Sequence, residues 1–241
     1  MSQVILMYRN ILENSTVTVT TENASYPKYR LYDRAIGKYF KGTAPANPFS
    51  IVVGQSPVYE VNSLVIPVGH NFNGLVMYLY HSPNGSSWTE ATHWTQGDAN
   101  LIYKTFSAET KVYWKLEIYA PATIVQLTEM FLTKAYTFAK NPSYTGNIAI
   151  RRNILRDQTQ AGLSRTVKLG ELKRARRYTV LVETTQKTEF QNWENLCQGF
   201  KPFYIIDHEG TAIFMENQVE MEFTFIAPLY WNCNLDLLEV L

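Results

Sequence analysis

The sequence is poor in cysteine and has no long apolar run, and each shortage excludes a class of protein. Cys197 and Cys233 are the two cysteines among 241 residues, too few for a disulfide framework or for the paired spacing of a zinc site. We expect both thiols to be reduced and buried, which favours synthesis in a reducing cytoplasm. The longest uncharged stretch, residues 61 to 89, is broken by asparagine, proline, glycine and histidine, so we expect no transmembrane segment. The opening residues, MSQVILMYRNILENS, lack a small-residue cleavage site, and we expect no secretory signal.

Motifs for catalysis are also missing. There is no Gly-x-Ser-x-Gly elbow, no glycine-rich phosphate loop and no distinctive pair of carboxylates for glycoside hydrolysis. None of the four histidines belongs to an H-x-H or H-E-x-x-H pattern. His81, His93 and Asp98 could converge on a metal ion, but scattered surface histidines are the simpler explanation. We therefore predict that the protein is not an enzyme and needs no cofactor.

What residues 1 to 138 do contain is a series of strands. Segments such as STVTVTT, NSLVIPV, LVMYLYHS and VYWKLEIYA alternate apolar and polar residues or form short β-branched and aromatic runs. Turn residues separate them at spacings typical of an antiparallel sandwich. In the stretch YHSPNGSSWTEATHW, a proline precedes an Asn-Gly pair, which suits a tight reversal because proline fixes φ and glycine accepts positive φ. This stretch predicts a hairpin between two sandwich strands.

Several segments of this part resemble the discoidin branch of the galactose-binding-like jelly rolls. Ser82, Asn84, Gly85 and Trp88 match that family's Ser-x-(Asp/Asn)-Gly-x-x-Trp turn, with one extra residue before the tryptophan. The segment VYWKLEIY resembles a later strand of the family, and Glu129 resembles a glutamate of its final strand. The resemblance implies a jelly-roll sandwich in which loops at one end bind sugars or lipid head groups.

Members of that family also often hold a structural calcium ion. Asp33 and Glu129 are the only pair that we would nominate as ligands here. Calcium needs several oxygen ligands, and Arg34 and Lys38, which follow Asp33 closely, oppose it. The alternative is a capping aspartate and a solvent-facing glutamate, so we predict no metal site.

Aromatic residues could supply a binding surface in the same part of the chain. Trp88, His93 and Trp94, with Tyr39 and Phe40, could form a platform for a sugar, because aromatic faces combine apolar surface with polar handles. The alternative is that the tryptophans fill the ends of the sandwich core. A pocket also needs convergent polar groups, and the sequence does not locate these.

Residues 139 to 241 follow a linker-like run, AKNPSYTG, and are also rich in predicted strands. The segment TEFQNWENLCQG predicts a helix over about 188 to 199, with a capping-box pattern from Thr188 and with Phe190 and Trp193 on one face. A hairpin that turns at HEG and a final strand, LDLLEVL, follow. This order resembles the distal tail and related tail-tip proteins of bacteriophages. The resemblance implies a homo-oligomeric ring in contact with tail-tube, hub and tail-tip proteins.

The stretch from 140 to 180 is strongly basic. It holds ten basic side chains against two acidic ones, a surplus of +8 that leaves −7 for the rest of the chain. It could bind nucleic-acid phosphates, protect a strand edge, or meet the acidic surface of a neighbouring copy. We favour the subunit contact and do not expect direct binding of nucleic acid. The residues that we expect at this contact are Arg151, Arg152, Arg165, Lys173, Arg174, Arg176 and Arg177.

The sequence thus predicts a mainly β protein with two domains. Residues 1 to 138 would form a galactose-binding-like β-sandwich, and residues 139 to 241 a β-rich assembly domain with one helix. Our leading hypothesis is a structural protein of a phage tail tip or baseplate, assembled in the host cytoplasm and located in the virion, whose ring links the tail tube to tail-tip proteins. The alternative is a carbohydrate-binding module protein that recognises a host surface glycan through residues 1 to 138.

Overall fold

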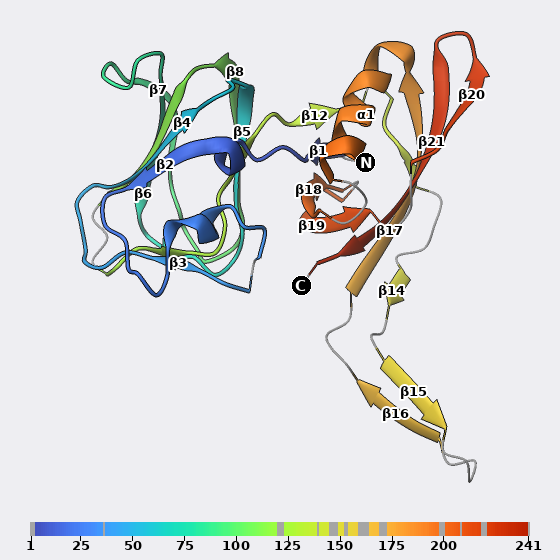
Figure 1. The fold of residues 1–241 in the computed structure, drawn as a ribbon, viewed down its shortest axis with the longest axis horizontal. Helices are drawn as coiled ribbons and strands as arrows, with labels where there is room; N and C mark the ends of the chain where they lie inside the picture. The colour runs from blue at the N-terminus through green and yellow to red at the C-terminus, as the bar shows by residue number, and fades with distance from the viewer. Residues whose placement is uncertain are drawn as a thin grey trace. The chain divides into compact units, whose positions relative to one another are not determined.

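The computed structural model describes most of the chain and divides it into two units. The described residues are 3–35, 37–119, 123–138, 140–144, 149–151, 154–158, 164–168, 173–197, 201–207, 209–217 and 221–240. The sandwich unit is Arg9–Ala135, and the helix unit combines Met1–Tyr8 with Tyr136–Leu241 (Figure 1). The described residues are mainly β with one α-helix, which confirms the predicted fold class.

Strands of the sandwich unit follow from alternation in the sequence. In β4 and β9, every second side chain is buried, so each strand gives one face to a core and the other to solvent. One sheet has the order β2-β4-β9-β6-β7, a second has the order β11-β5-β8, and β3 pairs with β10. The elements are η1 (Ile11–Asn14), β2 (Ser15–Val19), η2 (Lys28–Leu31), β3 (Phe40–Lys41), β4 (Phe49–Gln55), β5 (Glu60–Ile66), β6 (Val76–Ser82), β7 (Thr89–Thr95), β8 (Ile102–Thr110), β9 (Tyr113–Tyr119), β10 (Gln126–Leu127) and β11 (Phe131–Thr133).

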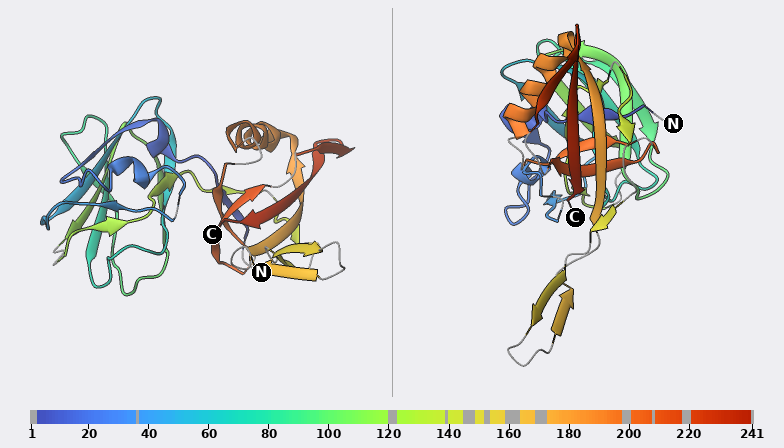
Figure 2. Two further views of the ribbon diagram at one scale, coloured as in Figure 1. Left: turned by 60° about the horizontal axis from the view of Figure 1, so that its bottom comes forward. Right: turned by 90° about the vertical axis from the view of Figure 1, so that its right-hand side faces the viewer.

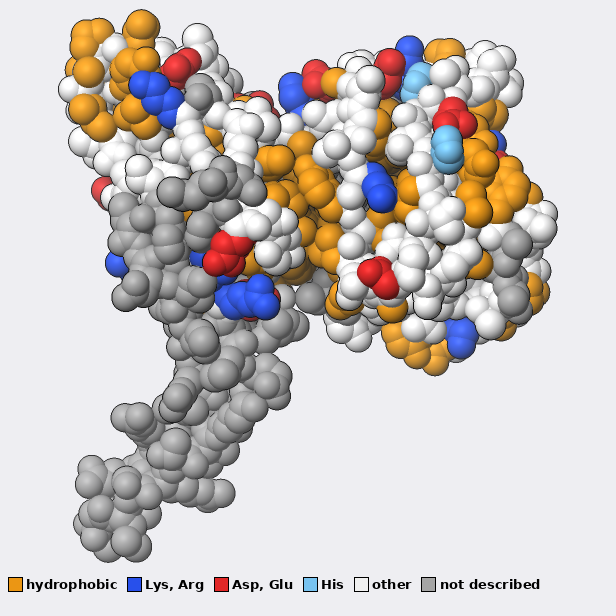
Figure 3. Space-filling view, turned by 180° about the vertical axis from the view of Figure 1, so that it is seen from behind, with side chains coloured by type: hydrophobic (Ala, Val, Ile, Leu, Met, Phe, Trp, Pro, Cys, Tyr) orange, Lys and Arg blue, Asp and Glu red, His pale blue; other side chains and the backbone are white. Residues whose placement is uncertain are grey.

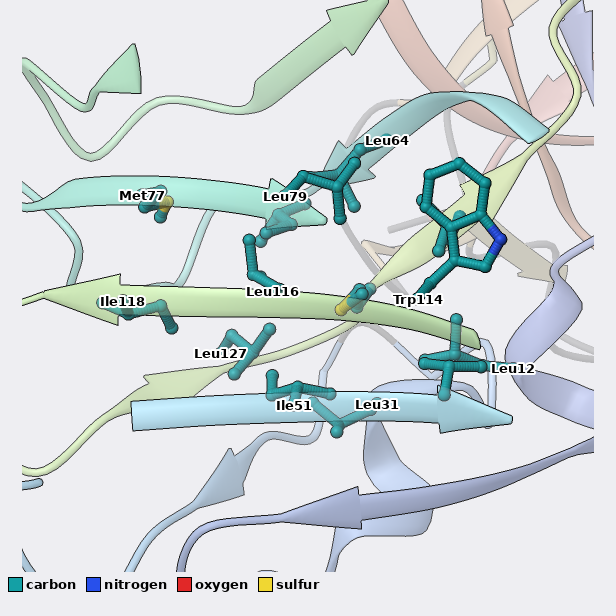
Figure 4. Packing of buried hydrophobic residues seen from close by; sticks show 14 of the residues in the cluster. Leu12, Leu31, Ile51, Leu64, Met77, Leu79, Trp114, Leu116, Ile118 and Leu127 are labelled. Atoms are coloured by element: carbon teal, nitrogen blue, oxygen red, sulfur yellow. The ribbon is translucent and has the colours of Figure 1, made fainter. Parts of the chain in front are cut away.

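The core of the sandwich unit lies between its sheets. Ile51 of β4, Leu79 of β6 and Leu116 of β9 point to the same interior as Leu64 of β5, and Trp114 is fully buried beside them (Figure 4). Each such side chain stabilises the fold by about 1.5–3 kcal/mol through its removal from water. The core fixes the strands, and the strands in turn fix the loops that join them.

The helix unit is built on one large sheet. Its strand order is β12-β1-β18-β19-β21-β17-β13, with β14 also paired to β17 and β20 to β21, while β15 and β16 pair with each other. The helix α1 covers a face of this sheet (Figures 1 and 2). The elements are β1 (Ile5–Met7), β12 (Tyr136–Thr137), β13 (Ser143–Tyr144), β14 (Ala149–Arg151), β15 (Ile154–Gln158), β16 (Ser164–Lys168), β17 (Lys173–Glu183), α1 (Thr184–Cys197), β18 (Phe203–Ile206), β19 (Ala212–Asn217), β20 (Phe223–Ala227) and β21 (Tyr230–Glu239).

The first residues of the chain belong to a different unit from the one that the sequence predicted. β1 lies between β12 and β18 and pairs with both. Val4, Leu6 and Tyr8 are buried in the core of the helix unit. Both its backbone pairing and its burial therefore assign this segment to the helix unit and not to the predicted domain of residues 1 to 138.

The helix α1 begins earlier than the predicted residue 188. Its start follows β17 directly, and the Thr184 N–H donates to the Leu229 carbonyl at 2.9 Å. Thr188 thus lies inside the helix instead of at its start. The predicted apolar face is present, since Phe190 and Trp193 are buried. None of the helices in the described part of the chain is long and apolar enough to span a membrane.

Candidate functional site

The stretch YHSPNGSSWTEATHW joins β6 to β7, as the sequence predicted. Ser82 Oγ accepts hydrogen bonds from the backbone N–H groups of Asn84 at 3.2 Å and Gly85 at 2.9 Å. The Asn84 side-chain oxygen accepts from the N–H groups of Ser86 at 2.9 Å and Ser87 at 3.0 Å. Gly85 has a φ of 76°, which glycine adopts without strain. The residues that resemble the discoidin motif therefore build a turn.

Trp88 lies over the outer face of the five-stranded sheet. The Lys115 ammonium is 4.5 Å from the centre of the Trp88 ring and 4.9 Å from that of Tyr80. It also pairs with Glu117 at 2.7 Å, and the other Glu117 oxygen accepts from the Tyr119 hydroxyl at 2.9 Å. This hydrogen bond raises the pKa of Tyr119 to about 12. We call this surface the aromatic face. Most of its polar side chains already have a hydrogen-bond or ion-pair partner within it.

His93 belongs to the same face, but its neighbour Trp94 does not. The His93 ring stacks on Tyr78, 5.3 Å between ring centres, and its Nδ1 is 2.7 Å from Glu90 Oε1. Trp94 points to the other side of β7 and is buried in the core, as Phe40 is. The sequence left two possibilities, a shared platform or tryptophans that fill the core, and Trp94 follows the second. The structure separates Trp94 from His93 because adjacent residues of a strand face opposite sides of the sheet.

Tyr39 lies on another surface of the sandwich unit. Its ring stacks on Tyr26, with 4.9 Å between centres and 12° between planes. A hydrogen bond with the Tyr26 hydroxyl raises the pKa of Tyr39. The guanidinium of Arg30 and the ammonium of Lys41 lie 5.5 Å and 5.9 Å from the centre of the Tyr26 ring. Lys41 therefore lies near this pair of rings and also lines a depression in the surface.

An open depression of about 660 Å³ is lined by loops of the sandwich unit; its lining residues are Lys41, Pro45, Asn71, Thr123, Ile124 and Gln126. We call it the loop-end depression. Lys41 of β3 and Gln126 of β10 are directly opposed across the two strands. This pairing could not be predicted from local pattern, because β3 and β10 are two-residue strands far apart along the chain.

Asn71 holds the loops of the depression together. Its side-chain oxygen accepts from the Gln126 N–H at 2.9 Å. Its side-chain nitrogen donates to the Ile124 carbonyl at 2.8 Å and to Thr123 Oγ1 at 3.1 Å. The Asn71 side chain thus fixes the backbone at Gln126, and the depression is therefore preformed.

Glu129, nominated as a calcium ligand, is fully buried, so the predicted solvent-facing glutamate is wrong. Asn10 Nδ2 donates to one carboxylate oxygen at 3.3 Å, and the Arg34 N–H donates to the other at 3.1 Å. The Arg34 guanidinium pairs with Glu13 in the same network. Burial, followed by the charge of Asp33, raises the pKa of Glu129 well above its usual range. N–H donors on both oxygens and a guanidinium beside them do not fit a calcium site.

The remaining nominated metal ligands have separate partners. Asp33 caps its own loop, with Oδ1 accepting from the Ala35 N–H at 3.0 Å. His81 is 4.0 Å from Glu109, and Asp98 accepts from Asn100. Within the described residues, no three His, Cys, Asp or Glu side chains are grouped so that they could hold a metal ion.

The basic stretch is largely neutralised inside its own chain, where its residues are described. Arg177, on β17, pairs with Asp236 at 3.0 Å across to β21, and the Arg174 Nε lies 3.8 Å from Glu239. Arg176 is buried and pairs with Asp207 at 3.2 Å, so its predicted place on a subunit contact is wrong. Arg152 lies outside the described residues. Only the backbone is described for the other predicted contact residues, Arg151, Arg165 and Lys173.

Comparisons with known proteins return solved structures only, since no protein-family model and no curated protein matches the sequence. The chain is similar to chitosan-binding module 1 of a Paenibacillus sp. IK-5 chitosanase/glucanase, at 19% identity over 52% of this chain and 99% of that one, with a TM-score of 0.47. It is similar to the Clostridium perfringens module CpGH89CBM32-5 in complex with GalNAc-β-1,3-galactose, at 15% identity over 52% of this chain and 100% of that one, with a TM-score of 0.47. A pectin-binding carbohydrate-binding module matches at 14% identity over 49% of this chain and 89% of that one, with a TM-score of 0.41.

Proposed function

We propose that the sandwich unit binds a carbohydrate in the loop-end depression. The observation that carries this proposal is the opposed pair Lys41 and Gln126. Among the described residues, the Lys41 ammonium and the Gln126 side-chain amide have no hydrogen-bond or ion-pair partner. An ammonium and an amide together offer donors and an acceptor to sugar hydroxyls. Pro45 and Ile124 add apolar surface for the C–H face of a sugar ring.

The depression suits a sugar better than the aromatic face does. On the aromatic face, Lys115, Glu117 and Tyr119 are already joined by an ion pair and a hydrogen bond. A sugar there would have to displace contacts that the fold has made. In the depression, the polar ends are available while their backbone is fixed, which lowers the entropic cost of binding.

The tail-tip hypothesis and its localisation in a virion stay predictions. Their main physical argument was charge complementarity between copies, and Arg174, Arg176 and Arg177 have acidic partners in the same chain. The absence of catalysis is likewise a prediction. Binding of a glycan without turnover is the function that the described geometry favours.

A glycan array probed with the full-length protein tests the proposal, followed by calorimetric titration of the best ligand. We expect Lys41→Ala and Gln126→Ala each to lower affinity by roughly tenfold, since each removes hydrogen bonds worth about 1–1.5 kcal/mol. Lys134→Ala is the matched control, because Lys134 is an exposed lysine of the same unit, paired with Glu60. It should bind as the unmodified protein does.

Two results would overturn the proposal. One is an array with no bound glycan among neutral and acidic sugars. The other is loss of binding in Trp88→Ala with full binding in Lys41→Ala, which would assign recognition to the aromatic face.

A further inference from the structure

The strand β20 is an edge of the sheet in the helix unit. One side of β20 pairs with β21, and no strand of the described residues pairs with its other side. Figures 1 and 2 show the β20–β21 hairpin at the margin of the sheet. An edge of this kind presents unpaired backbone N–H and C=O groups.

Apolar side chains cover this edge instead of the charges that usually protect one. Phe225 and Ile226 are 58% and 56% exposed, and Leu229 in the following turn is 68% exposed. The pairing of β20 with β21 is irregular between Phe225 and Ala227, and Ile226 has no partner residue on β21. Figure 3 shows hydrophobic side chains gathered at the top left, where this hairpin lies. The sequence of β20, FTFIA, contains no lysine, no proline and no other charged residue, so the irregular pairing at Ile226 is the one protecting feature within the strand.

An open edge with exposed apolar side chains indicates the chemistry of a partner. A lipid bilayer would accept the apolar side chains, but it offers nothing to unpaired backbone groups, and open sheet edges do not occur in hydrocarbon. A strand of another protein chain satisfies the backbone and the side chains together. A β-strand is therefore the partner that fits this edge best.

Charges at the two ends of β20 indicate which strand it is. Glu222 is exposed immediately before the strand. At the other end, the Lys140 ammonium lies 4.6 Å from the centre of the Tyr230 ring, and Tyr230 pairs with Ala227. In an antiparallel pair of identical strands, the acidic end of each copy meets the basic end of the other.

We propose that two copies of this chain associate through β20, antiparallel and centred on Phe225. This register places Glu222 opposite Pro228 of the second copy, close to the end where Lys140 lies. A two-fold contact of this kind uses the same patch on both copies, so it closes as a dimer and does not continue into a ring or filament. The strand is short, and we expect a dissociation constant on the order of micromolar.

Sedimentation velocity of the full-length protein over a range of concentrations tests the proposal. We expect a monomer–dimer equilibrium, and we expect Ile226→Lys to weaken it by roughly tenfold or more, because a lysine on an edge opposes strand pairing. Val68→Lys is the control, since Val68 is 60% exposed but lies in the sandwich unit. It should leave the equilibrium unchanged.

A charge exchange provides a readout that loss of apolar surface does not. Glu222→Lys and Lys140→Glu should each weaken the dimer severalfold, and the double variant should restore it. A monomer at every concentration would overturn the proposal, as would open-ended aggregates. Binding of the monomer to vesicles of phosphatidylcholine and phosphatidylserine, lost in Ile226→Lys, would assign the hairpin to a membrane and would also overturn it.

Discussion

At the scale of single residues, His70 has its proton fixed by two hydrogen bonds. The Phe72 N–H donates to Nδ1 at 3.3 Å, so the proton of the neutral ring is on Nε2, which donates to the Asn100 carbonyl at 2.8 Å. Burial lowers the pKa of His70 below its ordinary 6.5, although the Asn100 carbonyl and the charge of Asp98 oppose the shift. Protonation of Nδ1 would break the contact with Phe72.

The stability of the protein should therefore fall in mild acid. In the unfolded chain His70 titrates near 6.5, and in the folded chain it titrates lower, so the unfolded state binds more protons between the two values. The free energy of unfolding thus decreases as the pH falls below about 6.5. Urea unfolding at about pH 7.5 and about pH 5.5 measures the loss.

The variant His70→Gln should be less stable at the higher pH and should lose less stability on acidification. Burial also lowers the pKa of His81, so part of the slope should remain. Equal slopes for the two proteins would contradict the assignment.

Arg176 and Asp207 form a buried ion pair in the helix unit, with 1% and 0% of their side chains exposed. Arg176→Met should lower the free energy of unfolding by about 3 kcal/mol, because it leaves the Asp207 charge buried without its cation. Arg177→Met is the matched control, since the Arg177 side chain is 63% exposed and pairs with Asp236 on the surface. It should cost less than about 1 kcal/mol. Chemical unfolding compares the two variants, and similar losses would show that burial does not set the strength of the pair.

At the scale of elements, the β6–β7 turn depends on one backbone conformation. Gly85→Ala should destabilise the sandwich unit by about 1 kcal/mol, because φ is 76° there and a Cβ is disfavoured in that region. The new methyl group would meet the Tyr113 ring only at 3.5 Å, so the cost is in the backbone and not in a clash. Gly97→Ala is the control, because Gly97 has no positive φ and open space around it. Thermal unfolding should separate the two, and an equal shift of midpoint would argue against a strained turn.

Local pattern was enough to predict those elements whose own residues determine them. Alternation predicts β4 and β9, turn chemistry predicts the β6–β7 hairpin, and apolar spacing predicts the buried face of α1. Pairing between distant segments leaves no such pattern. The opposition of Lys41 and Gln126, which forms the loop-end depression, depends on two strands of two residues each. It could not be predicted for that reason.

The burial of Arg176 could have been predicted from the alternation of residues along β17. Tyr178, Val180 and Val182 are buried at every second position of β17. The same alternation, continued toward the N-terminus, places Arg176 on the inward face. The net charge of the whole stretch from 140 to 180 does not distinguish this buried arginine from its exposed neighbours.

At the scale of the whole molecule, the sandwich unit is an insertion into the helix unit. The chain leaves the helix unit after β1 and returns at β12, and these two strands pair with each other, Ile5 with Thr137 and Leu6 with Tyr136. The two ends of the sandwich unit therefore emerge from neighbouring strands. Insertions are tolerated at such points because they leave the pairing of the host sheet intact.

This arrangement predicts different behaviour for the two halves of the chain. A fragment of residues 9–135 contains the whole sandwich core and should unfold cooperatively. A fragment of residues 136–241 lacks β1, and with it the buried side chains of Val4, Leu6 and Tyr8. Their burial contributes about 5 kcal/mol, which is comparable to the total stability of a domain, so this fragment should show no cooperative transition.

A third protein tests whether β1 is the missing part. In it, residues 9–135 are replaced by Asn-Gly, so that Met7, Tyr8, Asn and Gly form a four-residue loop that joins β1 to β12 as a hairpin and retains the register of Leu6 with Tyr136. This protein should regain cooperative unfolding, followed by circular dichroism during heating. If it stays unfolded while the full-length protein melts in two transitions, the helix unit needs the sandwich unit for more than the delivery of β1. If the fragment of residues 136–241 already folds alone, β1 contributes less than its burial implies.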